Sequence, residues 1–211
     1  MNLFSHIWEA LYPPKCVFCR RDNGLVCPQH QKELDLQPEK FISPKQFTVF
    51  SVGNYSHPAI KKFLTFYKFN GIFTLSDFMG QQIIQHWSHE IPPKAILIPI
   101  PLHWSRFLWR GFNQSTRLAQ ALKKHRPDLI VCQNLKRVKR TKQQAKLDQK
   151  NRLKNMQNVF QLKPLNVPTN TPIFLIDDVY TSGATLHEAK NTLAQQGFTN
   201  IQGICFARTK H

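Results

Sequence analysis

Acidic residues are scarce in this sequence of 211 residues, where 12 Asp and Glu stand against 29 Lys and Arg for a formal net charge of +17. This excess is greater than solubility requires and predicts polyanionic partners, with nucleic acid and phosphorylated ligands ahead of an anionic membrane surface. Long apolar runs are also missing, since none approaches the roughly 20 residues that span a bilayer. The first residues lack the basic start of a signal peptide. We therefore expect a cytoplasmic protein without a membrane span.

Cysteine is sparse and unevenly placed, with three of the five cysteines within twelve positions near the N-terminus. They form Cys16-x-x-Cys19, followed after seven residues by Cys27-x-x-His30. Both pairs have the ligand spacing of a small tetrahedral Zn²⁺ site. Four protein ligands indicate a structural ion, because a catalytic zinc keeps one position open. We expect these four residues to hold Zn²⁺; the alternative is a group of free thiols without a metal.

The apolar pattern divides the chain in two. Residues 1–45 have little periodic apolar sequence and are expected to form a small zinc-ribbon-like module. Over residues 46–211, strand-like apolar runs alternate with helical patterns, which predicts an α/β domain with a mostly parallel sheet flanked by helices. The expected helices are Pro58–Phe69, Leu75–His89, Asn113–His125 and Thr185–Gln196, and the expected strands are 47–55, 94–100, 129–132, 172–177 and 199–207.

The run Pro172–Ile176 suits a central parallel strand and ends in two carboxylates, Asp177 and Asp178. Burying an unpartnered pair of carboxylates is costly. At the carboxyl end of a central strand, however, the pair faces the crevice where α/β sheets bind ligands. There the two acids can accept hydrogen bonds from sugar hydroxyls or hold a hydrated Mg²⁺. The alternative is a pair of simply solvated acids.

The next residues, Thr181–Thr185, are small and mostly hydroxylated and lead into a helical pattern. Exposed N–H groups and hydroxyls at a helix N-terminus can cradle a phosphate. Gly183 permits a positive φ or a close backbone approach, and Thr185 is expected to cap the helix. A turn rich in capping residues, without a ligand, is the competing interpretation.

Taken in order, Ile176–Thr185 resembles the phosphoribosyl pyrophosphate (PRPP) signature of type I phosphoribosyltransferases, and the chain as a whole resembles the ComF family of competence-associated proteins. The further residues that carry this resemblance are Pro99–Trp104, Arg106, Arg110–Ser115, Arg140–Gln144, Arg152, Asn155 and Phe160, with the Cys-rich start. The match covers nearly the whole chain. The family usually has a fourth cysteine where this sequence has His30.

The resemblance implies that Asp177 and Asp178 contact the ribose hydroxyls and organise Mg²⁺, as the catalytic pair if the protein is an enzyme. It implies that the loop after them holds the 5′-phosphate and that the turn at Pro101 lies beside the pyrophosphate. Arg110 suits bidentate phosphate contact, although packing on nearby aromatic rings is an equal alternative. The expected PRPP-binding residues are Asp177, Asp178, Val179, Tyr180, Thr181, Ser182, Gly183, Ala184, Thr185, Pro101, Leu102, His103 and Arg110.

A basic segment, Lys136–Lys154, holds nine basic residues and one acid, Asp148. Its lack of large apolar residues predicts a mobile loop rather than a packed core. The resemblance places here, at about 136–158, the flexible hood that closes over PRPP. The same charges can follow a single-stranded DNA backbone, although a solvated loop without a partner remains an alternative. The expected nucleic-acid-binding residues are Arg137, Lys139, Arg140, Lys142, Lys146, Lys150 and Arg152.

These features leave competing functions. The resemblance implies a ComF-type role in DNA uptake for natural transformation, with PRPP, Mg²⁺, single-stranded DNA and a competence helicase as the expected ligands and partners. Alternatively, the protein is an active phosphoribosyltransferase of nucleotide salvage or on an unknown acceptor, which would release pyrophosphate. Product formation with free bases favours the enzyme, and salt-dependent binding of single-stranded DNA favours the uptake protein.

Overall fold

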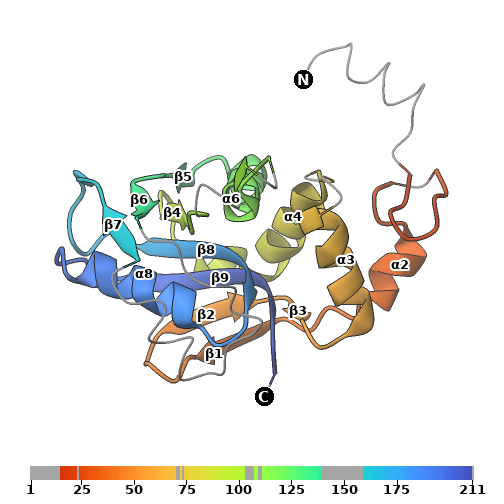
Figure 1. Cartoon of the computed structure of the whole chain (residues 1–211), viewed down its shortest axis with the longest axis horizontal. Coiled ribbons are helices and arrows are strands. Elements are labelled where there is room, and N and C mark those ends of the chain that lie inside the picture. The colour runs from red at the N-terminus through yellow and green to blue at the C-terminus, as the bar shows by residue number, and fades with distance from the viewer. Residues whose placement is uncertain are drawn as a thin grey trace, which may run out of the picture.

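The computed structural model describes residues 15–22, 24–69, 72, 74–102, 107–108, 111–138 and 159–210. Helices and strands alternate along most of this chain, as the apolar pattern predicts (Figure 1). The helices are α2 (Pro28–Glu33), α3 (Pro58–Phe69), α4 (Leu75–Trp87), η1 (Ser88–Glu90), α6 (Gln114–His125) and α8 (Ala184–Ala194). The strands are β1 (Glu39–Ile42), β2 (Thr48–Ser51), β3 (Gly53–Asn54), β4 (Ile96–Pro99), β5 (Ile130–Val131), β6 (Leu135–Arg137), β7 (Phe160–Leu162), β8 (Ile173–Tyr180) and β9 (Ile201–Arg208).

A seven-stranded sheet forms the centre of the molecule, in the order β1-β2-β9-β8-β4-β5, with β3 also paired to β9. Every pairing in it is parallel except that of β1 with β2. Strand β4 and the first four residues of β8 are continuous apolar runs because both of their faces are covered. The predicted α/β class with a mostly parallel sheet is therefore confirmed.

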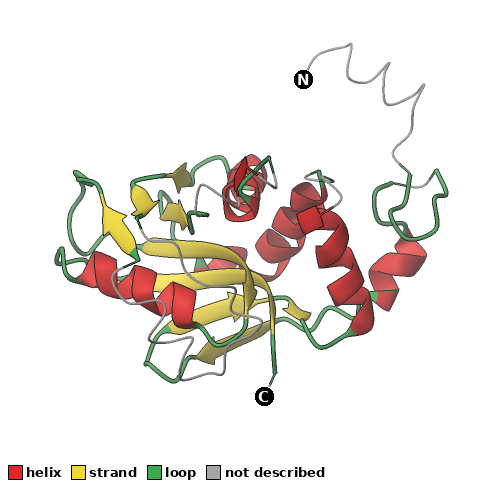
Figure 2. Cartoon of the chain, viewed as in Figure 1, coloured by secondary structure: helices red, strands yellow, loops and turns green. Residues whose placement is uncertain are grey.

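Helices cover both faces of this sheet, with α3, α4 and α6 on one side and α8 on the other (Figures 1 and 2). The alternation of side chains along β8 follows this division. Phe174 and Ile176 belong to the core beneath α3, α4 and α6, whereas Ile173 and Leu175 belong to the core beneath α8. This alternation ends at the two acids, because beyond them Val179 packs against the core beneath α3, α4 and α6 and Tyr180 belongs to the core beneath α8.

The N-terminal Cys-rich loop packs on α3. Its buried residues Val17, Val26 and Leu34 belong to the same apolar cluster as the residues of α3 that face the sheet. Phe18 meets Phe66 of α3 edge-on, with ring centroids 5.8 Å apart. The Cys-rich loop and α3 thus belong to one apolar core.

The four long helices agree with the sequence pattern, and α3 has the predicted bounds. Three strands were not predicted: β1, which pairs with β2, and the hairpin strands β6 and β7, which pair antiparallel. The expected end of the strand at residue 177 is wrong, because β8 continues to Tyr180 by pairing with β9 as far as Arg208. No helix in the described ranges is long and apolar enough to cross a bilayer.

Candidate ligand cavity and metal cluster

The two predicted acids lie at the carboxyl end of the central strand β8. Asp177 accepts hydrogen bonds at Oδ1 from the Ser115 hydroxyl, at 3.0 Å, and from the backbone N–H of Asp178, at 2.9 Å. Asp178 is only 8% exposed and forms an ion pair with Lys68, whose Nζ lies 3.0 Å from Oδ2. Both carboxylates therefore have partners that hold their orientation.

A cavity of about 200 Å³ opens over these acids. The ends of β4, β6 and β8, the end of α3 and the start of α6 contribute to its wall, as parallel strands bring their carboxyl ends to one edge. Its lining residues are Tyr55, Lys68, Ile100, Pro101, Leu102, Gln114, Ser115, Arg137, Asp177, Asp178, Val179, Thr181 and Thr185. The lining is mainly polar and contains two acidic and two basic side chains.

A smaller recess lies within the loop between β8 and α8. Gly183 is the residue before α8 and has a φ of 72°, the left-handed conformation that glycine adopts without strain. A side chain at this position would collide with Tyr180. Thr185 is the second residue of the helix, so its predicted capping role is wrong: the left-handed turn at Gly183 starts the helix two residues earlier. The first turn of α8 thus presents its free N–H groups to the recess.

The electrostatics of the acid pair favour a neutral carboxyl at one position. Burial, followed by the charge of Asp178, raises the pKa of Asp177 to about 7, against the opposing effects of the Asp178 N–H, Lys68 and Ser115. Two adjacent carboxylates in a poorly solvated place cannot both ionise freely. A cation or hydroxyl donors in the cavity would favour the charged form, so this site is suited to a ligand that brings them.

Most of the predicted PRPP-binding residues come together around this cavity and its recess. Pro101 and Leu102 follow β4 and line the cavity beside the acids, and Tyr180, Ser182 and Ala184 line the recess. His103 and Arg110 lie outside the described residues. Asn113 caps α6 by accepting from Ser115 N–H at 3.0 Å, and its Nδ2 donates to the carbonyl of Ile100.

Of the seven residues expected to bind nucleic acid, Arg137 lies within the described residues. It sits on β6, lines the cavity and stacks its guanidinium over Phe160 of β7 at 5.6 Å. The expectation of a loop from residue 136 is wrong at its start, since Lys136 and Arg137 pair with Gln161 and Phe160 in a hairpin. The other six, Lys139, Arg140, Lys142, Lys146, Lys150 and Arg152, lie outside the described residues.

Five residues that line the cavity were not among the predicted site residues: Tyr55, Lys68, Ile100, Gln114 and Ser115. Lys68 is one of three lysines of the amphipathic helix α3, where a lysine predicts a solvated face. Ser115 is the second residue of α6, where a serine suggests only a capping role. Nothing in the local sequence links these positions to β8, since Ser115 and Asp177 are 62 residues apart.

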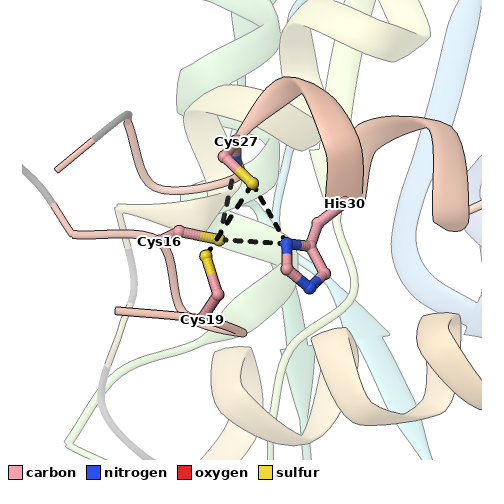
Figure 3. A group of neighbouring side chains, drawn as sticks. All are labelled: Cys16, Cys19, Cys27 and His30. Atoms are coloured by element: carbon pink, nitrogen blue, oxygen red, sulfur yellow. Dashed lines mark hydrogen bonds between the residues drawn. The ribbon is translucent and has the colours of Figure 1, made fainter. Parts of the chain in front are cut away.

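The four residues of the Cys-rich motif converge in space, with ligand atoms within 4.8 Å of one another (Figure 3). In a tetrahedral site with metal–sulfur bonds of about 2.3 Å, the sulfur atoms lie about 3.8 Å apart. The Sγ atoms of Cys19 and Cys27 are 3.9 Å apart, and Nδ1 of His30 lies 3.7 Å from Sγ of Cys16 and 3.0 Å from Sγ of Cys27. These distances fit a metal ion such as zinc.

The surroundings of the cluster also suit a metal. Burial raises the pKa of the Cys16 thiol, but hydrogen bonds from backbone N–H groups outweigh this effect and lower the pKa to about 6. The N–H group of Cys27 makes the largest of these contributions. The thiolate, which is the ligand form, is thus favoured. The second ring nitrogen of His30 lies 3.5 Å from the Glu33 carboxylate, the outer contact that commonly orients a metal-binding histidine.

The chain is similar in sequence to curated competence and DNA utilization proteins. It is 34% identical over 122 residues to competence protein F of Haemophilus influenzae, covering 57% of this chain and 53% of that protein. It is 35% identical over 141 residues to competence protein ComFC of Bacillus subtilis, covering 65% of this chain and 55% of that protein. It is 33% identical over 122 residues to the DNA utilization protein YhgH of Salmonella typhimurium, covering 57% of this chain and 51% of that protein. The chain spans about half the length of these curated relatives.

No protein-family model matches the chain. Among solved structures, it overlays on adenine phosphoribosyltransferase from Saccharomyces cerevisiae, complexed with an imino-altritol bisphosphate and adenine. The TM-score is 0.37 and the identity 14%, over 86% of this chain and 89% of that chain.

Proposed function

Since curated relatives named competence protein F and ComFC support a place in the ComF family, we propose that this protein binds PRPP with Mg²⁺ and acts in DNA uptake for natural transformation. One observation carries the proposal: the acid pair of β8 and the loop Thr181–Thr185 before α8 line one cavity and its adjoining recess. A phosphorylated sugar has hydroxyls that can donate to the two acids and a phosphate that the loop can hold.

Each part of the cavity has a role in this proposal. Asp177 and Asp178 accept hydrogen bonds from the ribose hydroxyls, and their oxygens are of the kind that Mg²⁺ prefers. The N–H groups and hydroxyls of Thr181–Thr185 hold the 5′-phosphate. Ser115 orients Asp177 by donating to Oδ1. When bound, Mg²⁺ supplies charge neutralisation for the pyrophosphate oxygens.

The Cys-rich cluster holds a structural zinc ion in this proposal. All four ligands come from the chain, which leaves no open coordination position for chemistry. The Cys-rich loop has only a small apolar core and packs on α3, so metal ligation contributes to the free energy of its folding. The residues that would hold the ion are Cys16, Cys19, Cys27 and His30.

Single-stranded DNA is the second proposed partner. The net charge of +17 supports a polyanionic partner, and the relatives' names connect such proteins with DNA utilization and competence. The proposed binding residues are those of the basic segment, beginning at Arg137, which also lines the ligand cavity. DNA and PRPP are therefore expected to influence one another's affinity at Arg137.

Isothermal titration calorimetry of the zinc-loaded protein with PRPP and Mg²⁺ tests the first part. The variants Asp177→Asn and Asp178→Asn should weaken binding at least about 10-fold, since each removes a charged hydrogen-bond acceptor. Asp77→Asn is the matched control, because that acid pairs with Lys124 and His125 on the surface. Equal affinity in all four proteins would refute the assignment of the acids.

Fluorescence anisotropy with a labelled single-stranded oligonucleotide tests the second part. Affinity should fall steeply with salt, by the counterion release of each neutralised phosphate, and titration with PRPP present should change the affinity. Binding that is insensitive to salt, or no binding at all, would remove DNA from the proposal.

An active phosphoribosyltransferase is the second candidate. Tyr55 favours it, because this residue lines the same cavity as the two acids and its aromatic ring offers a surface on which a base can stack. In this reaction an acceptor nitrogen displaces pyrophosphate at C1 of the ribose. Release of pyrophosphate with free bases, measured by an enzyme-coupled assay and lost in Tyr55→Ala, would support it.

A further inference from the structure

A lysine from outside the acid-and-loop motif enters the ligand cavity. Lys68 lies in the last turn of α3, and its ammonium is 3.0 Å from Oδ2 of Asp178. The side chains are only 17% and 12% exposed, so the pair is largely removed from water. Both residues line the cavity. Lys68 therefore brings a poorly solvated positive charge to the edge of the site.

Both acids line the main cavity, but the groups around them differ. Asp178 is paired with Lys68 of α3. Asp177 accepts from Ser115 of α6 and also lines the recess inside the loop before α8. Lys68 lines the main cavity but not this recess. A ligand lying over both acids thus has anion-binding groups on either side: the loop at one end and Lys68 at the other.

Stability alone is a weak reason for this ion pair, because desolvation of two buried charges offsets most of their attraction. A lysine ammonium has three N–H donors, and the contact with Asp178 takes one of them. The cavity lining carries two acids and two bases, Lys68 and Arg137. Addition of a divalent cation at the acids leaves an excess of positive charge, which suits a diphosphate rather than a neutral group.

We propose that Lys68 is a ligand-binding residue of this cavity: it donates to an oxygen of the ligand's diphosphate, while its ion pair keeps the Asp178 carboxylate turned toward the cavity. The inference rests on the proposed PRPP site and assigns the two ends of the ligand. The 5′-phosphate lies in the loop on the side of Asp177. The diphosphate lies on the side of Asp178 and α3.

Calorimetry with two partial ligands tests this assignment, in the presence of Mg²⁺. Lys68→Met should weaken binding of inorganic pyrophosphate and of PRPP by about 10- to 100-fold, the effect of losing a hydrogen bond to a charged group. Binding of ribose 5-phosphate should change by less than about 3-fold, because its phosphate lies in the loop. Lys68→Arg should restore most of the pyrophosphate affinity. Lys62→Met is the matched control, since that ammonium lies over the rings of Phe18 and Phe66, on the same helix.

Removal of Lys68 leaves Asp178 without its partner, so thermal unfolding is measured for each variant. If Lys68→Met does not fold, Asp178→Asn is compared with the double variant Asp178→Asn, Lys68→Met, which contains no unpaired buried charge. The double variant should bind pyrophosphate at least about 10-fold more weakly than Asp178→Asn alone.

Two outcomes overturn the inference: unchanged pyrophosphate affinity without Lys68, or a loss that falls on ribose 5-phosphate instead. If the wild-type protein binds neither PRPP nor pyrophosphate, the proposed PRPP site itself fails. The wild-type titration thus separates failure of the site from failure of the Lys68 assignment.

Discussion

Substitution of Gly183 by alanine should damage the loop before α8 in two separable ways. The residue has a φ of 72°, a left-handed conformation that costs an L-residue about 1–2 kcal/mol. The added Cβ would also lie 2.5 Å from Cζ and 2.7 Å from Cε2 of Tyr180 and would collide with its hydroxyl oxygen. That ring is 7% exposed and packs against Phe41 at 5.0 Å, so it has little room to move.

Overpacking of this kind costs about 1–3 kcal/mol, so Gly183→Ala should destabilise the protein by about 2–5 kcal/mol in total. Urea denaturation followed by circular dichroism measures the change. Gly197→Ala is the matched control at the other end of α8: its φ is 87°, but its nearest new contact is the methyl of Thr169 at 3.5 Å. The control should lose only about 1–2 kcal/mol.

The collision predicts a rescue. Tyr180→Ala removes the ring that the new Cβ would meet, so Gly183→Ala should cost no more in that background than Gly197→Ala does. If Gly183→Ala is no worse than the control in the wild-type background, the close approach of Tyr180 does not constrain the loop and our reasoning about its shape is wrong.

Three further results are expected. Chelation of the metal should accelerate hydrogen exchange in the Cys-rich loop and in α3, which it contacts through Phe18 and Phe66, but not in α8; equal protection with and without chelator would contradict the metal site. Burial, with the charges of Lys45 and Lys190, lowers the pKa of His187 from 6.5 to about 4. The unfolded chain therefore takes up this proton first, so stability is intact above pH 6.5 and falls between pH 6.5 and pH 4. His187→Phe should flatten that part of the curve of unfolding free energy against pH, and an unchanged slope would contradict the cause. Tyr67→Phe removes a buried 2.6 Å hydrogen bond to the carbonyl of Gln114 and should cost about 1–2 kcal/mol in urea denaturation, a value that a change below about 0.5 kcal/mol would refute.

The sequence was sufficient for the elements whose apolar pattern is strong. Helix α3 begins at Pro58 and ends at Phe69 as its periodicity predicts, and the central strands are recognisable because they are buried on both faces. Strand β1 escaped prediction because its residues alternate between partly buried and exposed and include a glutamate and a lysine. The hairpin of β6 and β7 joins residues separated by the basic segment, and such a pairing has no local signal.

The candidate site divides in the same way. The acid pair and the small-residue loop are adjacent in sequence, so their relation to one another could be predicted from strand and helix signals alone. Lys68 is 110 positions from Asp178, and only the packing of α3 beside β8 brings the two charges together. The cluster of Cys16, Cys19, Cys27 and His30 was predictable because the spacing of possible metal ligands is local in sequence, whereas the stacking of His30 on Phe18, with centroids 4.8 Å apart, depends on the folded loop.

A crystal structure of the zinc-loaded protein with PRPP and Mg²⁺ tests the central claim most directly. The account predicts ribose hydroxyls within hydrogen-bond distance of Asp177 and Asp178, the 5′-phosphate against the N–H groups of Thr181–Thr185, and the pyrophosphate on the side of Lys68. PRPP bound away from the carboxyl end of β8, or absent from crystals at saturating concentration, would contradict it.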